Sequence, residues 1–179
     1  MRPDKIIVHC SDSAWGHALI INKWHTDPPP QGRGWRAIGY HVVIQNGLPT
    51  ADHVRKNETI RMLDGQVELG RPLDADEDLE AHEMGAHVYG FNRTTLAVCL
   101  IGTDTFTRNQ IISLVKVVKW WQFQFRVKTK NVLGHYEMPT ARGKTCPNLD
   151  MEKIRSLIHY KSEAMRGLNN IPNLKENLG

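Results

Sequence analysis

The sequence has no long uninterrupted apolar run. Its longest strongly apolar stretch, near residues 111–125, is broken by Lys116 and Lys119, so it is too short and too charged to span a bilayer. The N-terminal segment enters a short apolar stretch that is too brief for the core of a signal peptide. These absences predict a chain that is made in the cytoplasm and does not insert stably into a membrane.

Cysteine is scarce, and the three residues present are Cys10, Cys99 and Cys146. An odd number of cysteines in a chain without a secretion signal argues against a framework of disulfide bonds. It leaves room for a thiolate that binds a metal ion. Cys10 and Cys99 lie inside apolar runs, so we expect both to be small, buried hydrophobic residues.

The charge of the chain is positive. A formal net charge of +4 and a pI of about 9.0 favour polyanionic partners such as nucleic acid, anionic lipid or acidic cell-wall polymer. No nucleic-acid-binding motif occurs, and Lys116 and Lys119 fit the solvated face of a helix, so we expect no nucleic-acid partner. A basic helix over 150–166 could touch anionic membrane or lipopolysaccharide, or it could pack on the sheet with its charges outward.

Short apolar runs alternate with amphipathic stretches along the chain. Residues 6–10 and 40–44 predict strands, and the unbroken apolar run 96–101 is typical of a strand covered on both faces. Apolar residues recur at helical spacing over 111–125, behind a capping-box pattern that starts at Thr107. The alternation predicts an α/β domain with a central mixed sheet flanked by helices.

The segments between these elements carry weaker patterns. A helix is predicted ahead of the three prolines at 28–30. The polar residues 48–63 predict an inserted loop, and the alternation after Asp64 and Gly65 predicts a strand. The acidic residues 74–83 predict a surface loop or a short helix. The inserted loop could border a substrate groove and alter substrate choice.

The last third of the chain predicts one more strand, one more helix and a tail. The strand is expected over 128–133 and the amphipathic helix over 150–166. From Gly167 the sequence is rich in Asn, Gly and Pro, which is typical of a loose tail. We therefore expect one domain over 1–166 and a C-terminal tail over 167–179.

Three residues of metal-binding type are candidates for a site. His9 ends an apolar strand beside Cys10, and because successive strand side chains point to opposite faces, one of these two faces the core and the other a cleft. His135 follows a predicted strand, and Cys146 lies further along, before the last helix. Two imidazoles and one thiolate form a standard zinc ligand set that leaves a fourth position for water. On spacing alone, a buried cysteine and two unrelated histidines explain the pattern equally well.

Four sequence blocks occur in a specific order along the chain. They are Ile7-Val8-His9-Cys10-Ser11, Gly34-Trp35-x-x-Ile38-Gly39-Tyr40-His41, Gly85-Ala86-His87-x-x-Gly90-Phe91-Asn92 and Gly134-His135-x-Glu137-x-Pro139-x-x-x-Gly143-Lys144-x-Cys146-Pro147. Together the blocks resemble the type 2 N-acetylmuramoyl-L-alanine amidase family, which includes bacteriophage lysozyme-type amidases and peptidoglycan recognition proteins. The resemblance implies their α/β fold and hydrolysis of the amide bond between N-acetylmuramic acid and L-alanine in peptidoglycan.

The resemblance also implies a zinc site, two catalytic side chains and two substrate-binding side chains. These are His9, His135 and Cys146 for Zn²⁺, Tyr40 and Lys144 for catalysis, and His87 and Asn92 for the substrate groove. Some family members carry a glutamate that acts as a base where this chain has Tyr40. From the residues alone, Tyr40 is a packed strand aromatic and Lys144 a solvated loop lysine.

The biological role has three interpretations. A phage endolysin without a wall-binding domain would reach the wall after release through the inner membrane. A cytoplasmic enzyme could instead recycle wall fragments. A peptidoglycan-binding protein without activity would typically lack the cysteine ligand, whereas Cys146 is present. We favour the endolysin, with peptidoglycan as its partner, acting as a monomer.

Overall fold

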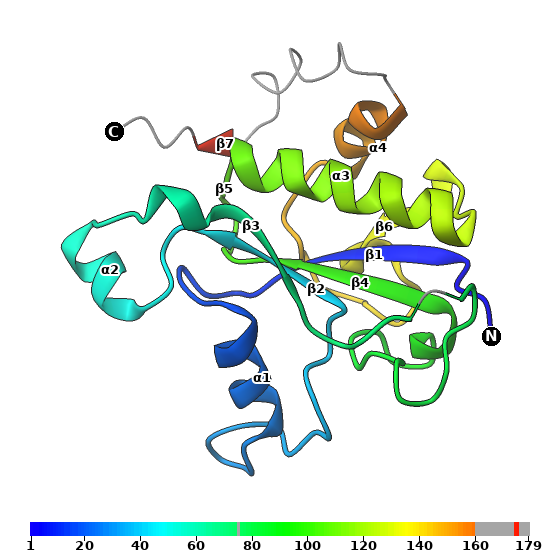
Figure 1. The fold of residues 1–179 in the computed structure, drawn as a ribbon, viewed down its shortest axis with the longest axis horizontal. Helices are drawn as coiled ribbons and strands as arrows, with labels where there is room; N and C mark the ends of the chain where they lie inside the picture. The colour runs from blue at the N-terminus through cyan, green and yellow to red at the C-terminus, as the bar shows by residue number, and fades with distance from the viewer. Residues whose placement is uncertain (75, 160–173, 176–179) are drawn as a thin grey trace.

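The computed structural model describes residues 1–74, 76–159 and 174–175, and its centre is a five-stranded sheet in the order β3-β2-β4-β1-β6 (Figure 1). The strands are β1 (Lys5–Cys10), β2 (Val42–Asn46), β3 (Asp64–Leu69), β4 (Thr95–Leu100) and β6 (Val132–Gly134). β1 pairs in parallel with β4 and β6, β2 is parallel to β4, and β3 runs antiparallel to β2. The predicted α/β class with a mixed sheet is confirmed.

Helices cover both faces of this sheet. α3 (Arg108–Phe125) and α4 (Met151–His159) lie on one face, and α1 (Ala18–Thr26) lies on the other (Figure 1). α2 (Ala51–Lys56) lies beside the sheet, on the connection between β2 and β3. The shorter described elements are η1 (Arg61–Leu63), η2 (Asn92–Thr94), η3 (Thr129–Asn131), η4 (His135–Glu137) and the strand pair β5 (Phe106–Thr107) and β7 (Leu174–Lys175).

Strand β1 divides its side chains between two layers because successive residues point to opposite faces. Ile6, Val8 and Cys10 belong to the large core beneath α3 and α4. Ile7 packs in a separate small cluster, and His9 lines a cavity. The predicted division, with one of His9 and Cys10 in the core and the other in a cleft, is confirmed.

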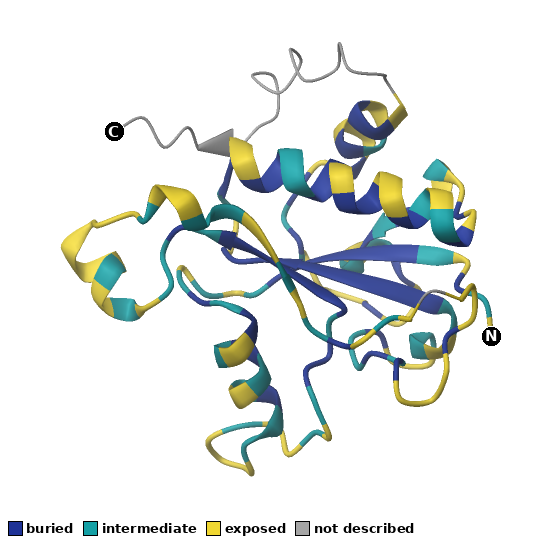
Figure 2. Cartoon of the chain, in the orientation of Figure 1, coloured by how far each residue is buried: buried dark blue, intermediate teal, exposed yellow. Residues whose placement is uncertain are grey.

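Helix α3 begins where the capping-box pattern predicts. The Thr107 hydroxyl accepts the Gln110 N–H at 3.0 Å, and the Thr107 N–H donates to Gln110 Oε1 at 3.0 Å. The Gln110 amide also donates to the carbonyl oxygens of Ile44 and Ile101, which joins the helix start to β2 and to the end of β4. Figure 2 shows the central strands buried and α3 buried only along the side that faces the sheet.

Two connecting segments differ from their predictions. Residues 48–63 contain α2 and η1 rather than loop alone, and α2 has no buried residue along its fully described length. The sequence of α2 therefore has no repeating apolar pattern from which a helix could be predicted. Residues 128–131 are not strand, because Lys128 and η3 (Thr129–Asn131) occupy them and only 132–134 pair with β1. Arg126, in a left-handed conformation with φ of 56°, ends α3 and redirects the chain before this turn.

The described part of the acidic segment 74–83 is a surface loop, one of the two predicted outcomes, built around a buried carboxylate. Glu83 is 1% exposed, and its oxygens accept the backbone N–H groups of Asp74 at 2.7 Å and Glu80 at 2.9 Å. A buried acid with these partners organises the loop from inside.

Helix α4 is described to His159, and residues 160–166 of the predicted helix lie outside the described residues. So does the predicted tail 167–179 apart from 174–175, and the domain boundary stays a prediction. Arg155 turns inward: it is 14% exposed and donates to the Val132 carbonyl and to both Glu137 oxygens. This packing favours a helix held on the domain over one that touches membrane. Within the described ranges, we find no helix with the length and apolar character needed to cross a bilayer.

Candidate metal centre

Two histidines meet at one edge of the sheet because their strands are neighbours. His9 is the second-last residue of β1, and His135 directly follows β6. β1 and β6 run parallel, with Val8 paired to Gly134, so both strands bring a histidine to the same edge. The two imidazole centroids lie 4.6 Å apart. The sheet register therefore brings together two residues that are far apart in the sequence.

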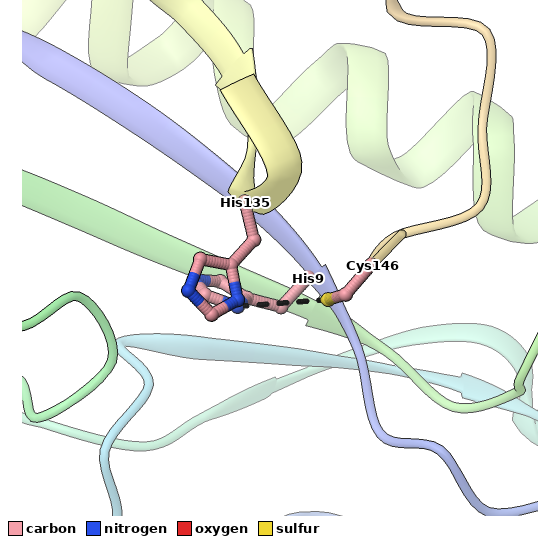
Figure 3. A group of neighbouring side chains, drawn as sticks. All are labelled: His9, His135 and Cys146. Carbon is pink, nitrogen blue, oxygen red and sulfur yellow. Dashed lines mark hydrogen bonds between the residues drawn. The ribbon is translucent and has the colours of Figure 1, made fainter. Parts of the chain in front are cut away.

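Cys146 is brought to the histidines by the loop before α4. The Tyr136 N–H donates to the Cys146 carbonyl at 2.9 Å, which fixes this loop to the turn that carries His135. The Cys10 N–H points at the Cys146 sulfur at 3.3 Å, and His9 Nδ1 lies 3.8 Å from that sulfur. The ligand atoms of His9, His135 and Cys146 all lie within 4.8 Å of one another (Figure 3).

All seven predicted site residues line one open cavity of about 650 Å³. His9 is 2% exposed, His135 and Cys146 are half-buried, and Lys144 is exposed. The cavity lies on the face of the sheet opposite α3, between the part covered by α1 and the loops that bury Ile7. The structure thus brings together every residue that the resemblance implied; their individual roles stay predictions.

The environment keeps both candidate histidine ligands neutral. Burial lowers the pKa of His9 well below its ordinary value, and the nearby His87, His135 and Lys144 add to this effect. Burial also lowers the pKa of His135, assisted by the charge of Lys144. Neutral imidazole is the form that binds metal ions. Both side chains are therefore in the protonation state that a ligand needs.

Cys146 is placed differently from the histidines. In the protein alone, a hydrogen bond with the Cys10 thiol and then burial raise the pKa of the Cys146 thiol, whereas the Cys10 backbone N–H lowers it. The N–H contact would stabilise a thiolate once a cation compensates its charge. In the protein alone, Cys146 is therefore a protonated thiol and not a free nucleophilic thiolate.

Comparison with known families decides the class of protein. The sequence model of the family described as N-acetylmuramoyl-L-alanine amidase matches residues 1–149. This chain belongs to the N-acetylmuramoyl-L-alanine amidase family. The predicted family and enzyme class are thereby confirmed.

Phage proteins are among the relatives of this amidase. It is 26% identical over 160 residues to an endolysin of Klebsiella phage KP32, an alignment that covers 83% of each chain. It is also 26% identical over 167 residues to an endolysin of Escherichia phage T7, covering 84% of this chain and 83% of the relative.

Solved structures share the fold of the amidase. The N-acetylmuramoyl-L-alanine amidase LysC from Clostridium intestinale matches with a TM-score of 0.65 at 20% identity, covering 90% of this chain and 88% of that chain. Drosophila PGRP-LB matches with a TM-score of 0.60 at 19% identity, covering 90% and 85%. At such identities the likeness shows the fold alone.

Tyr40 and Lys144 line the cavity of the amidase from different segments. Tyr40 precedes β2, and its ring centroid lies 5.1 Å from that of His9. Burial raises the pKa of the Tyr40 hydroxyl well above its ordinary value, with nearby thiols adding to the rise, so the hydroxyl keeps its proton. Lys144 stands in the loop just before Cys146. Each side chain therefore holds a hydrogen-bond donor beside the candidate ligands.

His87 and Asn92, predicted to bind substrate, have partners inside the amidase itself. The two ring nitrogens of His87 lie 3.1 Å from His9 Nε2 and 3.2 Å from Thr95 Oγ1. Asn92 Oδ1 accepts the N–H groups of His87 and Val88, both at 2.9 Å. Both residues line the cavity, and their contact with substrate stays a prediction.

His25, Arg33 and Trp35 are among the further residues that line the cavity of the amidase and were not predicted as site residues. His25 Nδ1 accepts the Gly39 N–H at 3.0 Å, and the His25 ring lies 4.7 Å from that of Trp35. The Arg33 guanidinium lies 5.3 Å from the centre of the Trp35 ring. Trp35 stands within one of the family blocks, which was the available signal. His25 and Arg33 carry no local pattern that marks a site.

Proposed function

We propose that this chain is a zinc-dependent N-acetylmuramoyl-L-alanine amidase that acts on peptidoglycan as a phage-type endolysin. The observation that carries the proposal is the convergence of His9, His135 and Cys146, with ligand atoms within 4.8 Å of one another, in an open cavity. The phage relatives named as endolysins support lysis as the biological role.

The donor set fits zinc. Two imidazole nitrogens and one sulfur match the nitrogen and sulfur preference of Zn²⁺, and three protein ligands leave a position open to the cavity. The low pKa values of His9 and His135 and the Cys10 N–H aimed at the sulfur suit the same ion. When bound, zinc would supply Lewis acidity that activates water and polarises the scissile carbonyl.

The chain's own residues would serve the rest of the reaction. As the amide is attacked, negative charge develops on its carbonyl oxygen, and the Lys144 ammonium at the cavity wall would stabilise that charge. The Tyr40 hydroxyl, which keeps its proton, would orient the attacking water or pass a proton toward the departing L-alanine nitrogen. The buried position of His9 keeps the floor of the site fixed.

The cavity also suits an anionic peptide. Among the described residues, its lining includes the cations Arg33 and Lys144 and a single carboxylate, Asp12. Stem peptides carry carboxylates, so we assign to Arg33 a role in holding the peptide beside the scissile bond.

Product analysis joined to metal analysis tests this function. The purified protein is assayed for bound metal and then incubated with bacterial sacculi, and the products are identified by mass spectrometry. We expect about one zinc per chain and release of free peptides that begin with L-alanine. Removal of zinc by a chelator should stop the release, and added zinc should restore it.

The same assay separates the competing functions. New reducing sugar ends without free stem peptides would mean a glycosidase and would overturn the proposal. Bound zinc without any cleavage would indicate a wall-binding protein. Cleavage of soluble muropeptides but not of intact sacculi would replace the endolysin with a recycling enzyme.

A further inference from the structure

A series of hydrogen-bonded side chains extends from His9, on the side away from Cys146. His9 Nε2 lies 3.1 Å from His87 Nδ1, and the two rings meet edge-on at 89°. His87 Nε2 lies 3.2 Å from the Thr95 hydroxyl. The Thr95 hydroxyl in turn donates to the Phe91 carbonyl at 2.9 Å. The side of His9 that faces away from Cys146 is therefore tied to the backbone through two further side chains.

The last hydrogen bond of this series determines which atom is the donor in each of the others. A carbonyl oxygen only accepts, so the single hydroxyl proton of Thr95 is committed to Phe91. Thr95 Oγ1 must then accept a hydrogen bond from the His87 Nε2–H group, which leaves His87 Nδ1 as an acceptor. His87 Nδ1 in turn accepts a hydrogen bond from the His9 Nε2–H group. The remaining lone pair of His9 is on Nδ1, the nitrogen 3.8 Å from the Cys146 sulfur.

We propose that His87 is a positioning residue that, together with Thr95, holds His9 in the tautomer that presents the Nδ1 lone pair to the metal. This inference deepens the proposed function and rests on it for the identity of the ion. Groups behind a ligating histidine orient its ring and strengthen its donation, and their loss typically costs about 10- to 100-fold in metal affinity.

The backbone around His87 is built to hold this position. Asn92 accepts the N–H groups of both His87 and Val88, so the loop cannot shift without losing two hydrogen bonds. Val88 is 1% exposed and belongs to the same buried cluster as Ile7 of β1. Thr95, the first residue of β4, is fully buried. The support for His9 thus comes from a rigid strand and a braced loop.

Two pairs of variants test the inference through zinc affinity, measured by competition with a chromophoric chelator. Thr95→Val removes the hydroxyl at nearly constant volume, and His87→Ala removes the ring; we expect each to weaken zinc binding about 10- to 100-fold. Thr95→Ser keeps the hydroxyl and should bind zinc within a few-fold of the parent protein. Unchanged affinity in both Thr95→Val and His87→Ala would overturn the proposal, as would an equal loss in Thr95→Ser and Thr95→Val.

A second measurement does not depend on the variants or on metal. Long-range ¹H–¹⁵N correlation spectra of the metal-free protein report the tautomer of each histidine ring. We expect protons on Nε2 of both His9 and His87, and a proton on His9 Nδ1 would overturn the proposal. If the parent protein binds no zinc, the proposed function fails, and these spectra still decide the arrangement of His9 and His87.

Discussion

Cys146 is the candidate ligand whose loss best separates metal binding from folding. It is half-buried in a loop, so a serine in its place disturbs little packing but replaces a thiolate with a weaker zinc ligand. We expect Cys146→Ser to lose bound zinc and amidase activity while its unfolding midpoint stays within a few degrees of the metal-free parent. Metal analysis, sacculus digestion and thermal melting check the three parts.

Cys99 offers the control for this substitution. Its side chain is fully buried in the cluster on the α1 face of the sheet, and it is not part of the candidate ligand set. Cys99→Ala should lower stability by about 1 kcal/mol and still bind zinc. Zinc retained in Cys146→Ser, or lost in Cys99→Ala, would contradict the ligand assignment.

Tyr40 tests the proton-transfer role apart from packing. Phenylalanine keeps the ring that lies against His9 and His25 and removes only the hydroxyl. We expect Tyr40→Phe to bind zinc normally and to lose about 100- to 10,000-fold in kcat, the usual range of a general acid–base contribution. Steady-state kinetics on a soluble muropeptide measures this, and an unchanged kcat would remove Tyr40 from the mechanism.

Lys144 tests the stabilisation of charge on the carbonyl oxygen. Methionine keeps an unbranched side chain one atom shorter than that of lysine and carries no charge, and the exposed position of Lys144 means that the change costs little stability. We expect kcat/KM to fall by about 100- to 1000-fold for Lys144→Met. Lys144→Arg, which keeps the charge, should recover part of that loss. Equal activity of the two variants would argue against an electrostatic role.

Helix α3 depends on two neighbouring residues that do different work. Thr107 is the N-cap residue of α3, and loss of its hydroxyl in Thr107→Ala should lower the free energy of unfolding by about 1 kcal/mol. Gln110 is fully buried and also satisfies the carbonyls of Ile44 and Ile101. We expect Gln110→Ala to cost clearly more, about 2 kcal/mol or above, because buried acceptors are left without donors. Urea unfolding of both variants compares them, and equal losses would show that only the cap matters.

The elements that were predicted correctly are those whose local signals agree with their packing. Residues 6–8 of β1 and 96–100 of β4 form unbroken apolar runs because both faces of these central strands are covered, and α3 combines a capping box with a regular apolar stripe. α2 was missed because it buries no side chain, and η3 was taken for strand because only tertiary pairing tells which residues reach β1. An element that buries no side chains has no apolar pattern, so the sequence does not predict it.

Prediction of the site was limited in the same way, because the site depends on contacts between residues far apart in the sequence. Residue chemistry identified His9, His135 and Cys146 as possible ligands, but their convergence needs β6 to lie beside β1 and the loop of Cys146 to close on Tyr136. Neither contact leaves a local pattern, so the four family blocks carried that part of the prediction. His25 and Arg33 were missed because no block contains them, although the fold brings both to the cavity.

Buried neutral histidines should make the stability of the whole domain depend on pH. His41 is 1% exposed; its Nδ1 accepts the Ala97 N–H and its Nε2 donates to the Glu83 carbonyl, so the fold holds the neutral form. Burial, the largest cause, lowers the pKa of His41 to about 4. In the unfolded chain the pKa returns to about 6.5.

The sign follows from which state binds the proton. Between pH 6.5 and 4 the unfolded chain takes up a proton at His41 and the folded protein does not, so the free energy of unfolding falls as the pH falls. The stability that depends on neutral His41 is fully present above pH 6.5 and is lost toward pH 4, with a total of about 3 kcal/mol.

Urea unfolding of the metal-free protein at several pH values between 7.5 and 4.5 measures this loss. His41→Asn removes the titrating ring, whereas His9 and His25, whose pKa values do not depend on His41, contribute equally in both proteins. The variant should be less stable than the parent at pH 7.5 and should lose less stability on acidification; parallel curves for the two proteins would mean that His41 is not held neutral by the fold.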